Sequence, residues 1–231
     1  MLTVEKLNQY YGESHTLWDL DLQVPQGACT VLMGRNGVGK TTLLQCIMGL
    51  IKARDGTIRY QGQDLLPVDA EKRASLGLGY VPQGRQIFPL LTVEENLLIG
   101  LPARRDRVDR IPPFIFELFP VLKEMPGRRG GDLSGGQQQQ LAIGRALVLD
   151  PKLLILDEPT EGIQPNIVAE IGDIIRKLNQ EIGLTVLLVE QKLPFARRVG
   201  DRFCILDRGQ QVASGMMDEL GDELVQHYLT V

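Results

Sequence analysis

The stretch Gly34-Arg-Asn-Gly-Val-Gly-Lys-Thr-Thr42 matches the pattern GxxxxGK[ST] and decides the fold class of this chain. The apolar run TVLM precedes it and the helical pattern TTLLQCIMGL follows it, which is the strand–loop–helix order that the pattern requires. The glycines allow successive backbone N–H groups to face phosphate oxygens, and the start of the helix adds partial positive charge. We therefore predict a phosphate-binding loop.

The polar side chains of this loop have expected roles. Lys40 supplies a positive charge for the β- and γ-phosphates of a nucleotide, and Thr41 supplies a hydroxyl ligand for Mg²⁺. The candidate nucleotide-binding residues here are Gly34, Arg35, Asn36, Gly37, Val38, Gly39, Lys40, Thr41 and Thr42.

Two carboxylates end a second apolar run, Leu153-Leu-Ile-Leu-Asp-Glu158. Such groups are costly to bury unless they meet a cation or exchange a proton. Asp157 is the natural Mg²⁺ partner of Thr41, and Glu158 could accept a proton from an attacking water. Taken alone, Glu158 could also be a solvated carboxylate before the turn at Pro159. Beside a phosphate-binding loop, we favour the catalytic interpretation.

A third motif, Leu133-Ser-Gly-Gly-Gln137, leads into the helical pattern QQQLAIGRALVL. Ser134 could simply cap that helix, with Gly135 and Gly136 as loop residues. The chain nevertheless has two glycine-rich helix starts and only one phosphate-binding loop. A second helix start suited to anions suggests either a second phosphate chain or one that belongs to a partner molecule.

Short apolar runs alternate with amphipathic ones along the chain, which predicts a doubly wound α/β core. From about Leu90 to Gly131 no strand pattern occurs, so we expect a mostly helical insertion there. Strands are expected at Leu2–Leu7, Leu20–Val24, Cys29–Met33, Gly56–Tyr60, Gly79–Val81, Leu153–Leu156, Thr185–Val189, Arg202–Leu206 and Gln211–Ser214. Helices are expected to begin near Gly39, Val93, Gln137, Pro165, Leu193 and Met217.

Composition narrows the functional classes. The 231 residues include 29 acidic and 25 basic ones, a net charge of -4, which disfavours binding to nucleic acid through overall charge. The longest apolar runs, such as Leu184–Val189, are far shorter than the roughly 18 residues of a membrane span. The cysteines Cys29, Cys46 and Cys204 form no CxxC pair, so we expect reduced core residues.

The ordered set GRNGVGKTT, Gln83 after a strand, LSGGQ, LILDE and the turn PTEGIQP resembles the ATP-binding subunit of an ABC transporter over essentially the whole chain. The resemblance implies an α/β fold with a RecA-like P-loop core, an antiparallel β-subdomain and an inserted helical subdomain. It implies one ATP-binding domain over residues 1–231, with residues 1–89 and 146–231 forming the core and β-subdomain. Residues 90–145 would form the helical subdomain that carries LSGGQ.

The same resemblance implies roles for further residues. Tyr11 stands where the family stacks an aromatic ring on adenine, with Tyr10 as the alternative. Gln83 would sense Mg²⁺ and nucleotide while contacting the membrane partner. Ser134, Gly135, Gly136 and Gln137 would close over ATP held by the partner of a head-to-tail dimer. Glu158 would be the catalytic base, while Thr41, Gln83 and Asp157 would hold the metal.

One position departs from the family pattern. A histidine that contacts the γ-phosphate commonly follows the next strand, and this chain has Gln191 there. Glutamine can donate a hydrogen bond but cannot carry charge. This site could therefore hydrolyse ATP differently, and a mainly regulatory, slowly hydrolysing half-site is one alternative.

The motifs EGIQP and VEQ resemble the second ATPase of importers for branched-chain amino acids and for urea or short amides, and the segment around Gln191 resembles the urea type most. This resemblance implies an ATPase at the cytoplasmic face of the inner membrane. It implies a second ATPase subunit or a second copy as partner, two permease subunits, and indirectly a substrate-binding protein. The apolar segment Ile111–Leu122 could contact the permease, or it could be the packed core of the helical subdomain.

Overall fold

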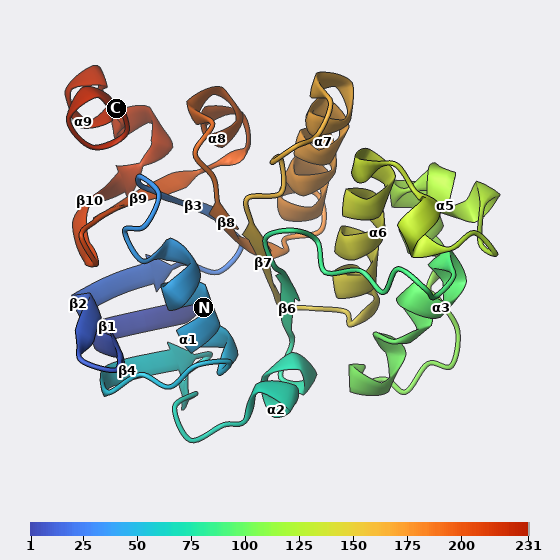
Figure 1. Ribbon diagram of the computed structural model, residues 1–231, viewed down its shortest axis with the longest axis horizontal. Coiled ribbons are helices and arrows are strands. Elements are labelled where there is room, and N and C mark those ends of the chain that lie inside the picture. Colours follow the sequence, from blue (N-terminus) through green and yellow to red (C-terminus); the bar gives the residue numbers. More distant parts are fainter. Residues whose placement is uncertain (231) are drawn as a thin grey trace.

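The computed structural model describes residues 1–230 and has two sheets and a helical segment. The four-stranded sheet is antiparallel, in the order β2-β1-β4-β5, and the six-stranded sheet has the order β10-β9-β3-β8-β7-β6 (Figure 1). The strands are β1 Leu2–Tyr11, β2 Ser14–Val24, β3 Cys29–Met33, β4 Asp55–Tyr60, β5 Gln63–Asp64, β6 Leu78–Val81, β7 Leu153–Asp157, β8 Thr185–Val189, β9 Arg202–Asp207 and β10 Gln210–Met216.

The helices follow the strands on both sides of the large sheet. They are α1 Lys40–Met48, α2 Ala70–Ser75, α3 Val93–Leu98, α4 Pro113–Leu118, α5 Pro120–Glu124, α6 Gly135–Val148, α7 Pro165–Gln180, α8 Leu193–Val199 and α9 Asp222–Tyr228. Short 3-10 turns lie at Leu101–Ala103, Gly130–Asp132 and Met217–Glu219. None of the helices between residues 1 and 230 combines the length and apolarity that a bilayer span requires.

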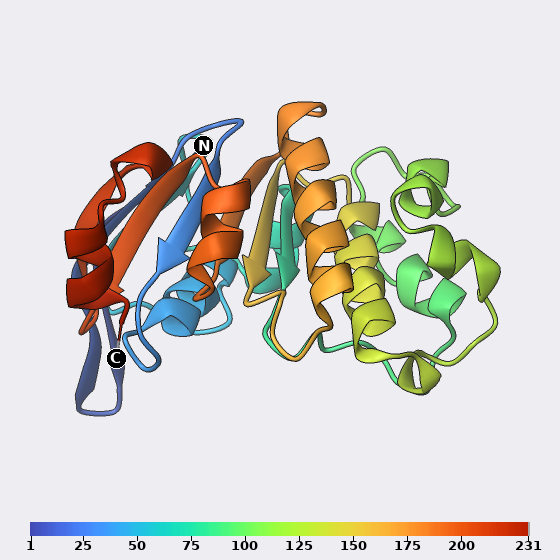
Figure 2. The same ribbon diagram turned by 90° about the horizontal axis from the view of Figure 1, so that it is seen from above.

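The strands of the large sheet from β9 to β6 are parallel and nearly all apolar, because both faces of the sheet are covered. Alternate residues of β7 pack into two different hydrophobic cores. Leu154 and Leu156 pack with α6, α7 and α8, whereas Leu153 and Ile155 pack with α1 and the small sheet. Figure 2 shows α1 on the opposite side of this sheet from α7 and α8. The doubly wound α/β core is thus confirmed.

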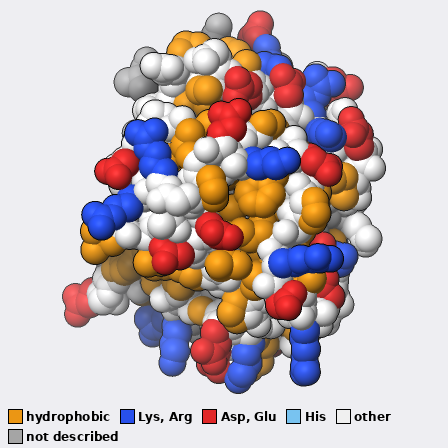
Figure 3. Space-filling model, turned by 90° about the vertical axis from the view of Figure 1, so that its right-hand side faces the viewer, with side chains coloured by type: hydrophobic (Ala, Val, Ile, Leu, Met, Phe, Trp, Pro, Cys, Tyr) orange, Lys and Arg blue, Asp and Glu red, His pale blue; other side chains and the backbone are white. Residues whose placement is uncertain are grey.

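The insertion after residue 90 is built from short helices, and the only strand-type pairing within it, among residues 1–230, is one bridge between Thr92 and Arg129. Its apolar segment is largely a packed core, since Ile115, Phe119 and Leu122 are fully buried. Partly buried apolar residues pack around them. Figure 3 views the molecule from the right-hand side of Figure 1 and shows apolar side chains in the middle of that face, with charged residues around them. Helix α6 continues as one helix through residue 145 to Val148, and the domain boundary placed there stays a prediction.

Two small elements were not expected from the sequence. The two residues of β5 pair with the end of β4, and α2 has the polar sequence AEKRAS, in which Arg73 alone is buried. The guanidinium of Arg73 donates to the backbone carbonyls of Cys46, Ile47, Leu65 and Val68 at 2.6 to 2.8 Å. It thereby fixes the C-terminal end of α1, the helix that begins at the phosphate-binding loop.

Replacing Arg73 with methionine is expected to lower the free energy of unfolding by about 3 kcal/mol or more, because buried carbonyls lose a charged donor. Urea denaturation of the isolated chain measures the effect. Arg59→Met, at an exposed arginine on β4, is the matched control and should stay within about 0.5 kcal/mol of the parent. Equal stability of the two variants would contradict this role of Arg73.

Candidate active site

The predicted site residues gather where the parallel strands β3, β6, β7 and β8 have their carboxyl ends. Ligands of open α/β sheets bind at this edge. A cavity of about 490 Å³ opens there, lined by Asn36, Gln83, Glu158, Thr160, Glu161, Glu190, Gln191 and Lys192. Three of these residues, Gln83, Glu158 and Gln191, were singled out as catalytic candidates, so the fold brings separate motifs to one place.

The phosphate-binding loop has the backbone that its glycines predict. Gly34 and Gly39 have φ angles of 145° and 106°, and a Cβ at Gly34 would lie 2.4 Å from the carbonyl oxygen of Leu206. A side chain therefore cannot be accommodated at Gly34. Helix α1 starts directly after the loop, so its first N–H groups face the space above it.

The ammonium of Lys40 lies inside the loop, where Nζ donates to the carbonyl oxygens of Gly34 (2.8 Å) and Arg35 (2.9 Å) and stands 4.0 Å from Oε1 of Glu158. Burial lowers the pKa of Lys40, and the nearby Glu158 and Asp157 oppose that effect. The backbone carbonyls of Gly34 and Arg35 and the carboxylate of Glu158 thus surround the Lys40 ammonium. This places its positive charge inside the loop, where phosphate oxygens would bind.

The other loop residues divide into two groups. Val38 and Thr42 are buried and belong to the support of the loop. Asn36 faces the cavity, where its Oδ1 accepts a 2.7 Å hydrogen bond from Nε2 of Gln191. The guanidinium of exposed Arg35 donates to the backbone carbonyl of Thr230, which ties this loop to the end of the described chain.

Asp157 has the environment of a cation ligand. Its Oδ2 accepts a 3.2 Å hydrogen bond from the hydroxyl of Thr41, and within residues 1–230 its buried Oδ1 has no hydrogen-bond partner. Burial raises the pKa of Asp157 to about 6. An unpaired buried carboxylate oxygen beside a hydroxyl fits Mg²⁺, which takes few protein ligands and completes its shell with phosphate oxygens and water. No cluster of three or more acidic, histidine or cysteine residues in the described chain offers a complete cage.

Replacing Asp157 with asparagine is expected to abolish the additional stabilisation that Mg²⁺ gives over ATP alone. In the absence of nucleotide, the variant should be at least as stable as the parent near pH 8. The reason is that a carboxyl whose pKa is raised on folding stabilises the fold only while protonated, and this contribution is lost as the pH rises towards 6. Thermal unfolding near pH 8 without nucleotide, with ATP plus EDTA and with ATP plus Mg²⁺ measures both effects. An unchanged Mg²⁺ increment would contradict the assignment.

Glu158 is held in a constrained position one residue beyond β7. Its φ of 48° lies in the left-handed region, which is unfavourable for a glutamate, and its N–H donates to the carbonyl of Val189 at 2.9 Å. Nε2 of Gln83 approaches its Oε2 at 3.4 Å, and Nε2 of Gln191 donates to its Oε1. The carboxylate therefore stands within reach of both loop glutamines and of Lys40.

Gln83 makes its shorter hydrogen bond, 2.9 Å, to the carboxylate of Glu161 in the turn after Glu158. Its side chain is exposed. Gln191 joins Asn36 of the phosphate-binding loop to Glu158 through the one NH₂ group. A neutral amide thus spans the position where the family commonly has histidine.

Tyr11 ends β1 with half of its side chain exposed, and its hydroxyl approaches Oε1 of Gln45 on α1 at 3.3 Å. The ring of Tyr10 is already engaged, since it stacks on His15 at 4.0 Å and lies under the guanidinium of Arg54. Of the two alternatives, Tyr11 is the one whose ring remains available for a planar ligand.

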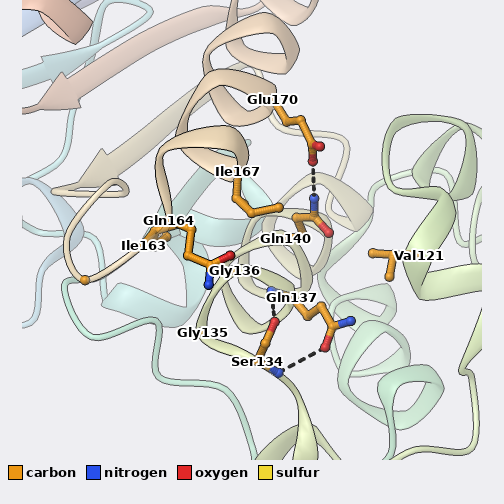
Figure 4. A pocket seen from close by; sticks show the side chains of 11 residues that line it. Val121, Ser134, Gly135, Gly136, Gln137, Gln140, Ile163, Gln164, Ile167 and Glu170 are labelled. Atoms are coloured by element: carbon orange, nitrogen blue, oxygen red, sulfur yellow. Dashed lines mark hydrogen bonds between the residues drawn. The ribbon is translucent and has the colours of Figure 1, made fainter.

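The third motif lies apart from this cavity. Ser134 caps α6 in a reciprocal pair with Gln137: the N–H of Gln137 donates to Oγ of Ser134 at 3.3 Å, and the N–H of Ser134 donates to Oε1 of Gln137 at 2.9 Å (Figure 4). Residues 134–137, with Gly162, Gln164 and α7, line a separate cavity of about 440 Å³. The two cavities share no lining residue, so within one chain Ser134, Gly135, Gly136 and Gln137 do not line the cavity of Glu158.

The sequence did not single out Thr160, Glu190 and Lys192, which also line the cavity of Glu158. A usable signal was present for Glu190, because it directly follows the apolar strand TVLLV as Asp157 ends LLILD. Charged residues at the carboxyl ends of buried parallel strands lie at the functional edge of such sheets.

Comparison with known proteins agrees with this geometry. Residues 17–161 match the family model described as ABC transporter. The chain is 43% identical over 213 residues to the high-affinity branched-chain amino acid transport ATP-binding protein BraG of Pseudomonas aeruginosa, covering 92% of this chain and 91% of that protein. It is 38% identical to the probable branched-chain amino acid transport ATP-binding protein LivF of Archaeoglobus fulgidus, covering 95% and 94%.

Solved structures give the same result. A dimeric ATP-binding cassette in a post-hydrolysis state, bound to ADP and Pi, superimposes with a TM-score of 0.83 at 26% identity and covers 94% of this chain and 99% of its own. An ATP-binding subunit of an ABC transporter gives a TM-score of 0.84 at 28% identity, covering 97% and 93%. With the family match, the relatives and the phosphate-binding loop in agreement, the chain belongs to the ABC transporter family of ATPases.

Proposed function

We propose that the chain is the ATP-hydrolysing subunit of an importer for branched-chain amino acids. One observation supports the hydrolytic part: the buried Oδ1 of Asp157 has no hydrogen-bond partner among the described residues, and Oδ2 of the same carboxylate is bonded to Thr41. The next residue, Glu158, has its carboxylate 4.0 Å from the ammonium of Lys40. The substrate part is supported by the two relatives above, both described as branched-chain amino acid transport proteins. This substrate replaces urea, which the sequence alone had favoured.

The residues have these proposed roles. Lys40 and the loop N–H groups bind the phosphates, while Tyr11 stacks on adenine. Thr41 and Asp157, with Gln83 nearby, hold Mg²⁺, which neutralises phosphate charge when bound. Glu158 accepts the proton of the attacking water, and Gln191 donates a hydrogen bond to the γ-phosphate in place of the bond it now makes to Glu158.

A partner is proposed to supply the remaining contacts. Because residues 134–137 line a cavity separate from that of Glu158, we propose that they meet nucleotide across a head-to-tail pair. The related cassette solved as a dimer with ADP and Pi supports such a pair. We propose a second ATPase subunit or a second copy in this role, with Ser134, Gly135, Gly136 and Gln137 facing the partner's ATP.

The permease contact is proposed at the loop after Gln83 and at α3. Phe88, Leu90 and Ile99 expose 45%, 79% and 44% of their side chains there. Exposed apolar side chains that form a contiguous patch are typical of interaction surfaces. Two permease subunits would hold the ATPase at the cytoplasmic face of the inner membrane, with a substrate-binding protein acting indirectly from the other side.

Gln191 motivates a second candidate function, a regulatory half-site that binds ATP and hydrolyses it slowly. A glutamine places a donor near the γ-phosphate without the charge that a histidine can carry. Hydrolysis would then take place chiefly at a partner's site.

Uptake assays test the substrate class. In a strain lacking the chain, expression of the parent should restore uptake of radiolabelled leucine, whereas expression of Lys40→Ala should not. Urea uptake, measured in parallel, should be the same with either protein. Restoration of urea uptake without leucine uptake would contradict the proposed substrate and return the urea assignment.

A further inference from the structure

Glu190 carries a buried carboxylate that has no role in the chemistry above. It follows β8 directly and is 2% exposed. Its Oε2 accepts a 2.7 Å hydrogen bond from the hydroxyl of Thr160, and its Oε1 accepts bonds from the N–H groups of Gln191 (2.8 Å) and Lys192 (2.9 Å). A buried charge is tolerated only when it is hydrogen bonded in this way, so its environment is specific.

The donors belong to two different segments of the cavity. Thr160, itself 1% exposed, lies in the turn that follows Glu158, whereas Gln191 and Lys192 begin the loop after β8. The ammonium of Lys192 also bonds to this turn, donating to the carbonyl of Thr160 at 2.9 Å. The hydroxyl and the carbonyl of Thr160 are therefore both held by the loop after β8.

These bonds connect the two groups that act on the reacting phosphate. Glu158 starts the turn that Thr160 anchors, and Gln191 receives its backbone orientation from Glu190 while its side chain reaches Glu158 and Asn36. We propose that Glu190 is a positioning residue that fixes the carboxylate of Glu158 and the amide of Gln191 relative to each other. This inference rests on the proposed function, because it concerns how the same site hydrolyses ATP.

The bonding pattern predicts which substitutions preserve this arrangement. A glutamine at 190 can still accept the two N–H groups through its oxygen, and its NH₂ group can donate to the Thr160 hydroxyl. An alanine loses every bond. At position 160, serine keeps the hydroxyl, whereas valine keeps the shape and removes the hydroxyl.

The experiment measures ATP turnover and ATP affinity in the assembled transporter. Glu190→Ala should lower kcat by about 10- to 100-fold, since a displacement of catalytic groups near 1 Å has effects of that order. The Kd for ATP should stay within about 3-fold, because the side chain of Glu190 bonds to no residue of the phosphate-binding loop. Thr160→Val should lower kcat in the same direction, whereas Glu190→Gln and Thr160→Ser should remain within about 5-fold of the parent.

The double variant Glu190→Ala/Thr160→Val should have nearly the kcat of Glu190→Ala alone, because the two residues act as one unit. Thr160→Val also keeps the test valid if Glu190→Ala does not fold. Asn179→Ala is the matched control. Asn179 is likewise buried and bonded to backbone carbonyls at 2.8 and 2.9 Å, but it lies outside the cavity, so its loss should lower stability without lowering kcat.

An active parent complex whose kcat is unaffected by Glu190→Ala and by Thr160→Val would overturn the inference. A loss of kcat in Asn179→Ala equal to that in Glu190→Ala would also overturn it, since general destabilisation would then suffice. A parent complex without any ATP turnover would instead contradict the proposed function itself.

Discussion

Replacing Glu158 with glutamine is expected to lower ATP turnover of the assembled transporter by about 100-fold or more, as for loss of a general base. The side chain stands beyond the end of β7 with Lys40, Gln83 and Gln191 around it, and its backbone is held at a φ of 48°. Glutamine has the same shape, so the phosphate-binding loop and its affinity for ATP should be retained. Release of phosphate at saturating Mg²⁺-ATP measures the effect.

Glu181→Gln is the control for this experiment, because Glu181 is an exposed glutamate at the C-terminal end of α7 and lines neither cavity. It should hydrolyse ATP at the parental rate. Turnover of Glu158→Gln close to that of the parent would mean that hydrolysis takes place at another subunit, which is the outcome expected for a regulatory half-site.

Replacing Lys40 with alanine is expected to weaken ATP binding by about 2 to 3 kcal/mol, roughly 30- to 150-fold in Kd, because hydrogen bonds to charged partners contribute this much. The ammonium is already positioned inside the loop by the carbonyls of Gly34 and Arg35, so little rearrangement is needed to meet phosphate. Equilibrium titration of the isolated chain with ATP measures the change.

Lys177→Ala removes an exposed lysine from α7 and should leave the Kd for ATP unchanged. In Lys40→Ala the carbonyls of Gly34 and Arg35 lose their hydrogen-bond donor, which could destabilise the loop. Thermal unfolding without nucleotide should therefore accompany the titration, to show that the variant is folded. Unaltered ATP affinity in a folded Lys40→Ala protein would contradict the assignment of residues 34–42 as the nucleotide site.

The parts of the site that follow from local sequence were predictable. The loop of residues 34–42 needs particular glycines at fixed spacing, and the structure shows the φ angles that require them at Gly34 and Gly39. Asp157 was recognisable because a charged residue at the end of an apolar strand needs a partner. In the structure its carboxylate accepts a hydrogen bond from the hydroxyl of Thr41. The roles expected of Tyr11, Gln83 and residues 134–137 came from the resemblance to a family with a RecA-like core.

Other parts depend on contacts between segments far apart in the sequence. The bond between Thr160 and Glu190 joins residues 30 positions apart, and no spacing rule indicates it. Helix α2 is polar and short, and Arg73 links it to α1 through bonds that appear only once both helices are placed. The expected strands Leu2–Leu7 and Leu20–Val24 were too short, because β1 continues to Tyr11 and β2 begins at Ser14. These additional parts of the hairpin include exposed polar residues, which hide the strand pattern.

The two cavities are separate within one chain, and this separation bears on how the ATP site is completed. Within one chain the phosphate-binding loop and residues 134–137 line different spaces, and each lies at the start of a helix. In the proposed function, a complete site therefore needs a second molecule to supply residues 134–137. The turn after Glu158 lines parts of both cavities, through Glu161 and Gly162, and so lies between the proposed partner surface and the proposed base.

Photolabelling follows hydrolysis at this subunit alone. The assembled transporter is incubated with Mg²⁺ and 8-azido-ATP labelled at the α- or the γ-phosphate, irradiated after increasing times, and the label in this chain is quantified. We predict that the α-label persists in the parent while the γ-label is lost, and that both labels persist in Glu158→Gln. A parent chain that takes up no label, or that keeps its γ-label as long as Glu158→Gln does, would contradict ATP hydrolysis at this subunit.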